Sequence, residues 1–388
     1  MTNKLSYILK GDRGIWIIVF FLFLFSLLSV YSATGNLAFS KVGGNTTYYL
    51  LRQGFLLFLG VSFIFITHLV PYKYFSKLSV YFFYLSIILL IITLIWGINV
   101  NEAKRWIMLP GGISFQTSDF AKLSLIMYLA RVLAIKEKEI VTFSGTLKHL
   151  MLPIFITCGL IVFADFSTAM LLFLTAMLLL LIGRVKFAYL SAIIGVGIIM
   201  TVLFIVVVKS SGASHRIDTW ESRWESFRGG EENIQSKHTK IAVATGGLFG
   251  KGPGKSNQRI VLPYSYSDYI FAIIVEEFGI LFGAIPLVIL YLFLFLRSRN
   301  IVSKINKKFG TYVTSGLALL IVLQAFANMA VAVDFLPVTG QPLPFVSYGG
   351  TSIFFTGIAI GIILSVSREA YDKKEENTLN ETSENNGE

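Results

Sequence analysis

The sequence predicts an all-α polytopic membrane protein with about ten transmembrane helices, because apolar windows of about 20 residues, enough to cross a bilayer, recur along the chain. The 388 residues are 55% hydrophobic with a mean hydropathy of +0.71, which is too apolar for an ordinary soluble domain. The apolar windows are continuous runs of Leu, Ile, Phe and Val. They do not alternate polar with apolar residues, which favours helices over a membrane β-barrel.

The apolar windows define one transmembrane domain, residues 1–367, followed by a charged tail, residues 368–388. The first window follows Lys10 and Arg13 and could be a signal peptide; its length and hydropathy favour a retained first span. The tail is rich in Glu, Asn, Ser and Thr, which predicts a disordered cytoplasmic end. The ten candidate spans are residues 15–34, 50–70, 78–98, 119–134, 150–164, 168–183, 187–208, 268–296, 311–334 and 351–367.

The distribution of Lys and Arg predicts that both termini lie in the cytoplasm. With that orientation the inner segments carry most basic residues, and the short outer loops carry only Lys41, Lys104 and Arg105 away from span ends. This asymmetry follows the positive-inside rule. Topology therefore explains much of the net charge of +11, and a nucleic acid partner is not expected. The single cysteine, Cys158, and four scattered histidines predict no disulfide and no Cys- or His-built metal site.

One predicted outer segment, residues 209–267, is much longer than the other outer loops. It contains paired glycines and tryptophans and is net basic. A long basic loop held on rigid spans is suited to meeting an anionic ligand. A solvated loop kept soluble by its charge is the alternative, and composition does not separate the two.

Three polar segments are predicted on the outer face, and residues 103–124 are the first. Arg105 and Lys122 are hydrogen-bond donors for a phosphate, and Trp106 offers a face for a sugar or a prenyl chain. The alternative is structural: Trp106 could belong to the aromatic belt of the interface. Lys122 could likewise snorkel or pair with Asp119 three residues earlier.

The second polar segment, residues 244–268, is glycine-rich. Its five closely spaced glycines permit close backbone approach. Lys251, Lys255, Gln258 and Arg259 add donors, a combination suited to holding a pyrophosphate. The segment matches neither the Walker pattern nor the dinucleotide fingerprint, so a nucleotide is not expected.

The third polar segment, residues 335–352, contains three prolines and three glycines before the last span. This composition predicts a re-entrant or tightly folded loop, which a membrane tolerates only inside protein or beside a wet cavity. Ser347, Gly349 and Gly350 could line that cavity, or they could simply cap the last span.

Three carboxylates lie at the start of the eighth candidate span. Asp268 could be the N-cap of that helix. Steps of four residues place Glu276 on the same helical stripe as Asp268 and about 12 Å deeper, near mid-membrane. An ionised carboxylate at that depth costs at least about 2.5–3.5 kcal/mol. Glu276 and Glu277 are therefore predicted to be protonated, paired or facing a hydrated cavity.

The order and spacing of these segments resemble the SEDS family of bacterial peptidoglycan glycosyltransferases, whose members include FtsW and RodA. The resemblance covers nearly the whole chain and is specific. The GKGPGKSNQR form is more similar to the division branch than to the elongation branch. The motifs that carry the resemblance are RWI (105–107), FQTSDFAKL (115–123), GGLFGKGPGKSNQ (246–258), SDYIFAIIVEEFG (267–279) and PVTGQPLPFVSYGGTS (337–352).

The resemblance implies a ten-span enzyme that polymerises lipid II on the outer face of the bacterial inner membrane, at the division septum. Asp268 matches the aspartate required for catalysis in that family, and Trp106 and Lys122 match its early motif. The chain departs from the family at residues 263–268, which read PYSYSD in place of PEAHTD. Tyr264 or Tyr266 could replace the missing polar groups, or those groups could be dispensable.

The implied reaction is inverting attack by one lipid-linked disaccharide on another, with Asp268 as base. Arg105, Lys122 and Lys255 would hold the pyrophosphate. Glu276 and Glu277 could support the site. No cofactor is certain, although a divalent cation, Mg²⁺ or Mn²⁺, could assist.

The implied partners are a class B penicillin-binding transpeptidase and other division membrane proteins. Three alternatives stay open: a lipid II flippase, a non-catalytic division scaffold, and a role in elongation. Transporters usually bind substrate near mid-membrane between repeats, and this sequence contains no visible repeat, which favours the enzyme.

Overall fold

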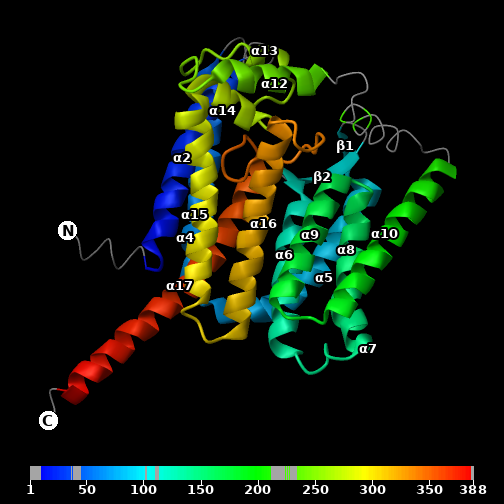
Figure 1. Ribbon diagram of the computed structural model, residues 1–388, viewed down its shortest axis with the longest axis vertical. Helices are drawn as coiled ribbons and strands as arrows, with labels where there is room; N and C mark the ends of the chain where they lie inside the picture. The colour runs from blue at the N-terminus through cyan, green and yellow to red at the C-terminus, as the bar shows by residue number, and fades with distance from the viewer. Residues whose placement is uncertain are drawn as a thin grey trace.

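The computed structural model describes residues 10–35, 37, 45–100, 103–109, 113–210, 223, 225, 227 and 234–385, and it shows a bundle of helices (Figure 1). In chain order the helices are α2 (Arg13–Ala33), α4 (Thr46–Leu69), α5 (Tyr72–Trp96), α6 (Thr117–Ile135), α7 (Phe143–Thr146), the π-helix η1 (Leu147–Met151), α8 (Leu152–Val162), α9 (Phe166–Ile182), α10 (Phe187–Ser210), α12 (Ile234–Gly246), α13 (Gln258–Val261), α14 (Ile270–Gly279), the π-helix η2 (Ile280–Ala284), α15 (Ile285–Val302), α16 (Lys308–Ala332) and α17 (Gly350–Asn385).

The predicted class, an all-α polytopic membrane protein, is confirmed. Among the described residues, eight helical stretches are long and apolar enough to cross a membrane. Two further helices coincide with predicted spans: α9 is shorter, and α6 carries Asp119, Lys122 and Arg131. The count of ten spans stays a prediction.

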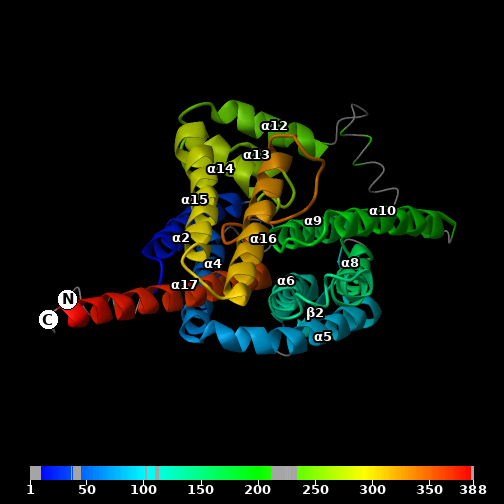
Figure 2. The same cartoon turned by 60° about the horizontal axis from the view of Figure 1, so that its bottom comes forward.

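Helix α16 lies at the centre of the bundle and contacts α6, α9, α14, α15 and α17 (Figure 2). Its side chains are buried on most sides, among them Val313, Leu317 and Ala325, each 0% exposed. Polar residues on such a helix face protein and not lipid, and they must find partners there. The central position of α16 therefore directs its polar side chains into the protein.

Close packing of α17 against α4 depends on small residues. A Cβ atom on Gly357 would lie 2.7 Å from the carbonyl oxygen of Gly60, and one on Gly361 would lie 2.8 Å from the carbonyl oxygen of Ile64. Gly357 and Gly361 are four residues apart, the small-xxx-small spacing that lets membrane helices approach closely. This contact holds the last span, and the loop that precedes it, against the bundle.

The start of α2 and the end of the last span lie at the same end of the molecule. Asp12 caps α2, with Oδ1 accepting from the backbone N–H of Gly14 at 2.8 Å, and its Oδ2 accepts from the Tyr371 hydroxyl at 3.3 Å. Helices α12 and α13 lie at the opposite end (Figure 1). Past the last span α17 continues to Asn385, so residues 368–385 of the tail predicted to be disordered have helical backbone; residues 386–388 lie outside the described residues. Residues 368–385 contain no Gly or Pro and several Glu and Lys residues, which favour helix.

A small antiparallel sheet precedes α6. The sequence did not predict this sheet. Strands β1 (Ile98–Val100), β2 (Ala103–Leu109) and β3 (Ile113–Gln116) are ordered β1-β2-β3. Trp106 is paired with Ile98 on one side and Gln116 on the other. The sheet fixes the position of Arg105 relative to the start of α6.

The predicted continuous helix across residues 268–296 is wrong. Gly279 has φ +74°, and a Cβ atom there would lie 2.4 Å from both the backbone nitrogen of Gly250 and the carbonyl oxygen of Leu248. Together α14, η2 and α15 span Ile270–Val302, 33 residues, which as one straight helix would be about 50 Å long against a hydrocarbon core of about 30 Å. Helix α14 is therefore a separate short element that packs on α12 (Figure 1).

Candidate functional site

Asp268 lies just before α14, and its backbone is held on both sides. Its carbonyl oxygen accepts from Asn328 Nδ2 at 2.8 Å, and its N–H donates to the Tyr264 carbonyl at 3.1 Å. The N-cap of α14 is Tyr269, with no side-chain capping bond. The interpretation of Asp268 as a helix cap is therefore wrong, and its carboxylate is free of that structural role.

The proline-rich loop of residues 333–349 folds against Asp268. Gly340 faces the carboxylate, since a Cβ atom there would lie 3.6 Å from Asp268 Oδ2. Asn328 Nδ2 also donates to the Gln341 carbonyl at 2.7 Å. The Ser347 hydroxyl donates to the Ser267 carbonyl at 2.7 Å and accepts from the Leu343 N–H at 2.8 Å. Ser347 thus joins the loop to the residue before Asp268 and does not cap α17.

A chain of polar contacts continues from this loop to Arg105. Gln341 Nε2 donates to Thr168 Oγ1 at 2.7 Å, and the Thr168 N–H donates to Asp165 Oδ1 at 3.1 Å, which caps α9. Asp165 Oδ2 lies 3.6 Å from Arg105 Nη1, and Arg105 Nε donates to the Ala164 carbonyl at 2.9 Å. The Arg105 side chain is 36% exposed, so it can reach a ligand.

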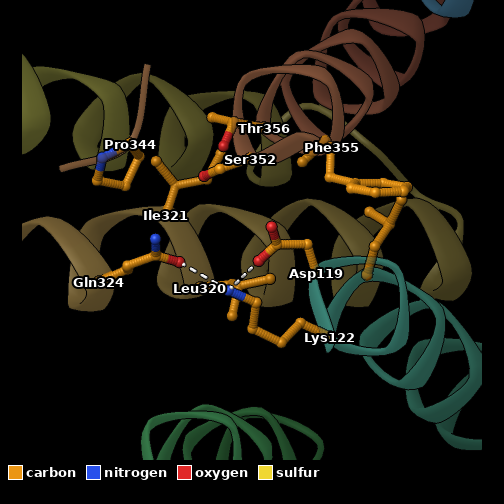
Figure 3. A pocket seen from close by; sticks show the side chains of 11 residues that line it. Asp119, Lys122, Leu320, Ile321, Gln324, Pro344, Ser352, Phe355 and Thr356 are labelled. Atoms are coloured by element: carbon orange, nitrogen blue, oxygen red, sulfur yellow. Dashed lines mark hydrogen bonds and ion pairs between the residues drawn. The ribbon is translucent and has the colours of Figure 1, made fainter. Parts of the chain in front are cut away.

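Lys122 lies in a more enclosed part of the site, beside a cavity of about 20 Å³ (Figure 3). Its Nζ lies 2.8 Å from Asp119 Oδ1 and donates to Gln324 Oε1 at 3.2 Å. The predicted pairing with Asp119 is thus confirmed, and Lys122 is only 5% exposed. Gln324 Nε2 donates to the Pro342 carbonyl at 3.1 Å, which ties this part of the site to the proline-rich loop.

Burial raises the pKa of the Asp268 carboxyl above its ordinary value. The Ser267 hydroxyl, which donates to Oδ1 at 2.8 Å, and the charges of Arg105 and Arg223 act in the opposite direction, while the nearby charge of Asp165 raises it further. Burial also raises the pKa of the Tyr266 phenol. Asp268 therefore has the surroundings of a group whose basicity is increased.

Glu276 belongs to a second cluster, formed with the glycine-rich loop. It is 0% exposed. Its Oε1 lies 2.6 Å from Lys251 Nζ and accepts from the Asn257 N–H at 3.2 Å. Its Oε2 accepts from the Ser256 hydroxyl and, at 3.2 Å, from the Gln258 N–H. The carboxylate is paired, one of the predicted solutions. Its predicted depth near mid-membrane rested on an unbroken helix, and that helix is interrupted at Gly279.

Glu277 joins the same loop to α2. Its Oε1 accepts from the Ser32 hydroxyl and, at 3.3 Å, from the Ser256 N–H. Arg259 Nη1 donates to the Ser32 hydroxyl at 3.1 Å and to its carbonyl at 3.3 Å. Lys251 and Arg259, predicted as ligand donors, are thus occupied in holding the loop.

The remaining predicted site residues lie either near Asp268 or in the cluster of Glu276, Glu277 and the glycine-rich loop, which we call the loop cluster. Trp106 is partly exposed on β2, next to Arg105, and Gly349 ends the proline-rich loop. Gln258 belongs to the loop cluster, where its Oε1 lies 2.8 Å from His238 Nδ1, and Lys255 is exposed on the same loop. The Tyr266 ring lies 5.7 Å from that of Tyr348, and its carbonyl accepts from the Tyr348 N–H.

The sequence analysis missed Asp165, Gln324 and Asn328. A signal for two of them was present, because Gln324 and Asn328 lie one helical turn apart in an otherwise apolar span, and such polar residues face the protein interior. Asp165 had no comparable local signal. Asp119 Oδ2 and Asn328 Oδ1 are buried without a hydrogen-bond partner in the described part of the chain, which leaves two acceptors at the site.

Within the described residues no three His, Cys, Asp or Glu side chains come together as a metal site. Asp165 and Asp268 are close enough to interact electrostatically. Magnesium is commonly held by one or two carboxylates together with substrate phosphates, so Asp165 and Asp268 are the residues that would hold it. The divalent cation stays a prediction.

The fold and the site define a polytopic helical membrane protein whose polar, aspartate-centred site lies at one end of the bundle. The chain belongs to the FtsW, RodA and SpoVE family, whose model, described as "Cell cycle protein", matches residues 12–372.

Two relatives support the same assignment, and two solved structures share the fold. Two relatives are named "Probable peptidoglycan glycosyltransferase FtsW". The one from Trichlorobacter lovleyi is 32% identical over 88% of this chain and 89% of the relative. The one from Bacillus subtilis is 31% identical over 88% of this chain and 87% of the relative. The crystal structure of the rod shape determining protein RodA of Thermus thermophilus has a TM-score of 0.68 at 22% identity, over 93% of this chain and 98% of that one. A structure described as a peptidoglycan synthase complex that coordinates polymerization and crosslinking has a TM-score of 0.71 at 22% identity, with the same coverage.

Proposed function

We propose that this protein is a peptidoglycan glycosyltransferase that polymerises lipid II into glycan strands at the division septum. Its relatives carry that activity in their names. The observation that carries the proposal furthest is the position of Asp268, which has no capping role. Asn328 holds its backbone carbonyl, and Ser267 donates to its carboxylate, which faces the proline-rich loop.

In the proposed reaction the 4-hydroxyl of one lipid-linked disaccharide attacks the anomeric carbon of another. Asp268 accepts the hydroxyl proton as the new glycosidic bond forms, and undecaprenyl pyrophosphate leaves with the electrons of the broken bond. A pyrophosphate is a good leaving group, so one base can suffice where a glycosidase uses two carboxylates. The raised pKa of Asp268 makes it a stronger base.

Arg105 is the proposed donor for the pyrophosphate. Its guanidinium is partly exposed and only loosely paired with Asp165, at 3.6 Å, so it can turn to a ligand and stabilise the developing charge. The neighbouring Trp106 would stack on a sugar or prenyl chain. Lys122 is already paired with Asp119 and Gln324; it would hold the walls of the site and contact the ligand only by exchanging one of these partners.

The loop cluster would position the glycine-rich loop beside the membrane surface, with Lys255 available to a second phosphate. The flippase alternative drew support from two carboxylates at mid-membrane. Both instead bind the loop, so that support is lost. The scaffold alternative predicts that Asp268 has no chemical role, and the experiment below separates it from the enzyme.

The proposed location is the bacterial inner membrane, with both termini in the cytoplasm and Asp268 on the outer side. The excess of Lys and Arg at the end carrying the termini supports this orientation. We propose a class B penicillin-binding transpeptidase and other division membrane proteins as partners, a view supported by the structural similarity to a peptidoglycan synthase complex.

The test is glycan strand formation from lipid II by the full chain, reconstituted with a class B transpeptidase. Wild type should form strands, and Asp268→Asn should be slower by about 10²- to 10⁴-fold, the usual contribution of a general base. Ser191→Ala, a change on the exposed face of α10, is the matched control and should keep full activity. Full activity of Asp268→Asn would contradict the base assignment.

A further inference from the structure

A groove of about 450 Å³ lies between α5, α6 and the η1–α8 segment. These helices lie side by side in Figure 2. The groove is at the end of the bundle that carries α7, away from α12 and α13 and therefore away from Asp268 (Figure 1). The proposed reaction does not use it.

One end of this groove is basic. It is lined by Arg131, Lys136, Lys148 and His149. Arg131 Nη1 donates to the Ser76 carbonyl at 2.7 Å and to its hydroxyl at 3.0 Å, which fixes the guanidinium between α5 and α6. Lys136 Nζ lies 3.1 Å from His149 Nε2. Arg131, Lys136 and Lys148, three side chains that carry positive charge, thus line the same end of the groove.

Among the described residues, Glu139 pairs with this basic end. Glu139 Oε2 lies 3.0 Å from Lys136 Nζ and 2.8 Å from His149 Nε2. Its side chain is 54% exposed, so it can move away from the groove at little cost. Lys136 holds the pKa of the Glu139 carboxyl below its ordinary value. An anion entering the groove would compete with Glu139 for Lys136.

The other end of the groove is apolar and open to the membrane. It is lined by Val80, Phe83, Ile87, Pro153 and Ile156. Tyr84 and Leu152, at its edge, are 58% and 53% exposed. The groove therefore joins a cationic end to an apolar end with an exposed edge, the arrangement expected of a site that spans the lipid interface and the hydrocarbon region.

We propose that this groove binds one anionic glycerophospholipid from the leaflet on the side of the termini, which is the cytoplasmic leaflet in the orientation proposed above. The phosphate would contact Lys136 and Lys148, and an acyl chain would lie along Val80 and Ile156. Basic pockets between membrane helices on the cytoplasmic side bind such headgroups. A transmembrane helix of another protein would cover the apolar end but would leave the basic end without a counter-charge.

The test measures the first bound lipid on the detergent-purified full chain by native mass spectrometry. The probes are phosphatidylglycerol and phosphatidylcholine with identical acyl chains. Wild type should bind phosphatidylglycerol at least about tenfold more tightly. The double variant Lys136→Gln/Lys148→Gln should lose roughly 10- to 30-fold in that affinity, because each basic residue near an anionic headgroup contributes about fivefold.

Two further variants test the site in independent ways. Glu139→Gln removes the competing carboxylate and should tighten phosphatidylglycerol binding. Ile156→Trp fills the apolar end and should weaken binding of both lipids. The matched control is Lys73→Gln/Arg299→Gln, which removes the same charge from two exposed residues at the same end of the bundle and should bind as wild type does.

Two results would overturn the proposal. One is equal binding of the two phospholipids by wild type; the other is an equal loss in the control and in Lys136→Gln/Lys148→Gln, which would indicate diffuse surface charge. A photoreactive amino acid at Ile156 in membranes should become attached to phospholipid. Attachment to a second protein instead would identify a different occupant. Binding is measured without enzyme activity, so the result is independent of the proposed function.

Discussion

Asp268 has to be ionised to accept a proton, yet its surroundings favour the protonated form. The rate of polymerisation should therefore rise as the pH increases past the raised pKa of Asp268. Ser267→Ala removes a hydrogen bond to the charged carboxylate, which raises that pKa further and should move the acid limb of the rate profile to higher pH. Rates of strand formation across a pH series measure this. An acid limb that stays in place would contradict the assignment of Asp268 as base.

The same carboxylate should lower the stability of the folded protein at neutral pH. Because the folded-state pKa is raised, the folded protein binds more protons than the unfolded one between the ordinary and the raised values, so stability falls as pH rises through that window. Asp268→Asn should therefore unfold at the same temperature as wild type or higher, while losing activity. Thermal unfolding in detergent at neutral pH measures this. A marked decrease would mean that the ionised form stabilises the fold.

The Asp119–Lys122 pair is buried, with both side chains 6% exposed. Lys122→Met leaves the Asp119 carboxylate unpaired and should cost about 3–5 kcal/mol of unfolding free energy. The double variant Asp119→Asn/Lys122→Met should recover much of that loss. As a control, Lys136→Met breaks a pair that is 37% and 54% exposed and should cost no more than about 1 kcal/mol. Equal losses for the two lysines would mean that burial does not decide the effect.

At the scale of the element, α14 depends on one glycine. Gly279→Ala forces a side chain into a left-handed conformation and against the backbone of Gly250, so the protein should unfold at a clearly lower temperature or fail to fold. Gly195→Ala is the matched change in α10, where a Cβ atom has nothing within 4 Å. It should be neutral or stabilising by about 0.5–1 kcal/mol. Similar unfolding temperatures for the two variants would contradict the close approach of α14 to the glycine-rich loop.

At the scale of the whole molecule, the orientation in the membrane can be measured with cysteines. Cys158 is buried and should react little with a polar reagent. A membrane-impermeant maleimide should label Lys255→Cys in intact cells and Lys138→Cys only after permeabilisation. The reverse pattern would place Asp268 in the cytoplasm and would remove the proposed site from the lipid II polymerisation surface.

Local sequence predicted several features well. The positions of the apolar helices and the Asp119–Lys122 pair at three-residue spacing follow from hydropathy and helical periodicity. The sheet before α6 was not predicted, because its strands are short and two of them depend on pairing with β2. The break at Gly279 was not predicted, because hydropathy does not distinguish an apolar helix from an apolar turn.

Length and hydropathy by themselves determined that this chain is a helical membrane protein, because a bilayer requires continuous apolar helix wherever the backbone crosses it. Motif order identified the family. Only the tertiary structure decided which residues meet at the two clusters: Asp268 with Asn328 and Gly340, Arg105 with Asp165, and Glu276 with Lys251. These partners are far apart in the chain, so their contact depends on helix packing and on the turn at Gly279.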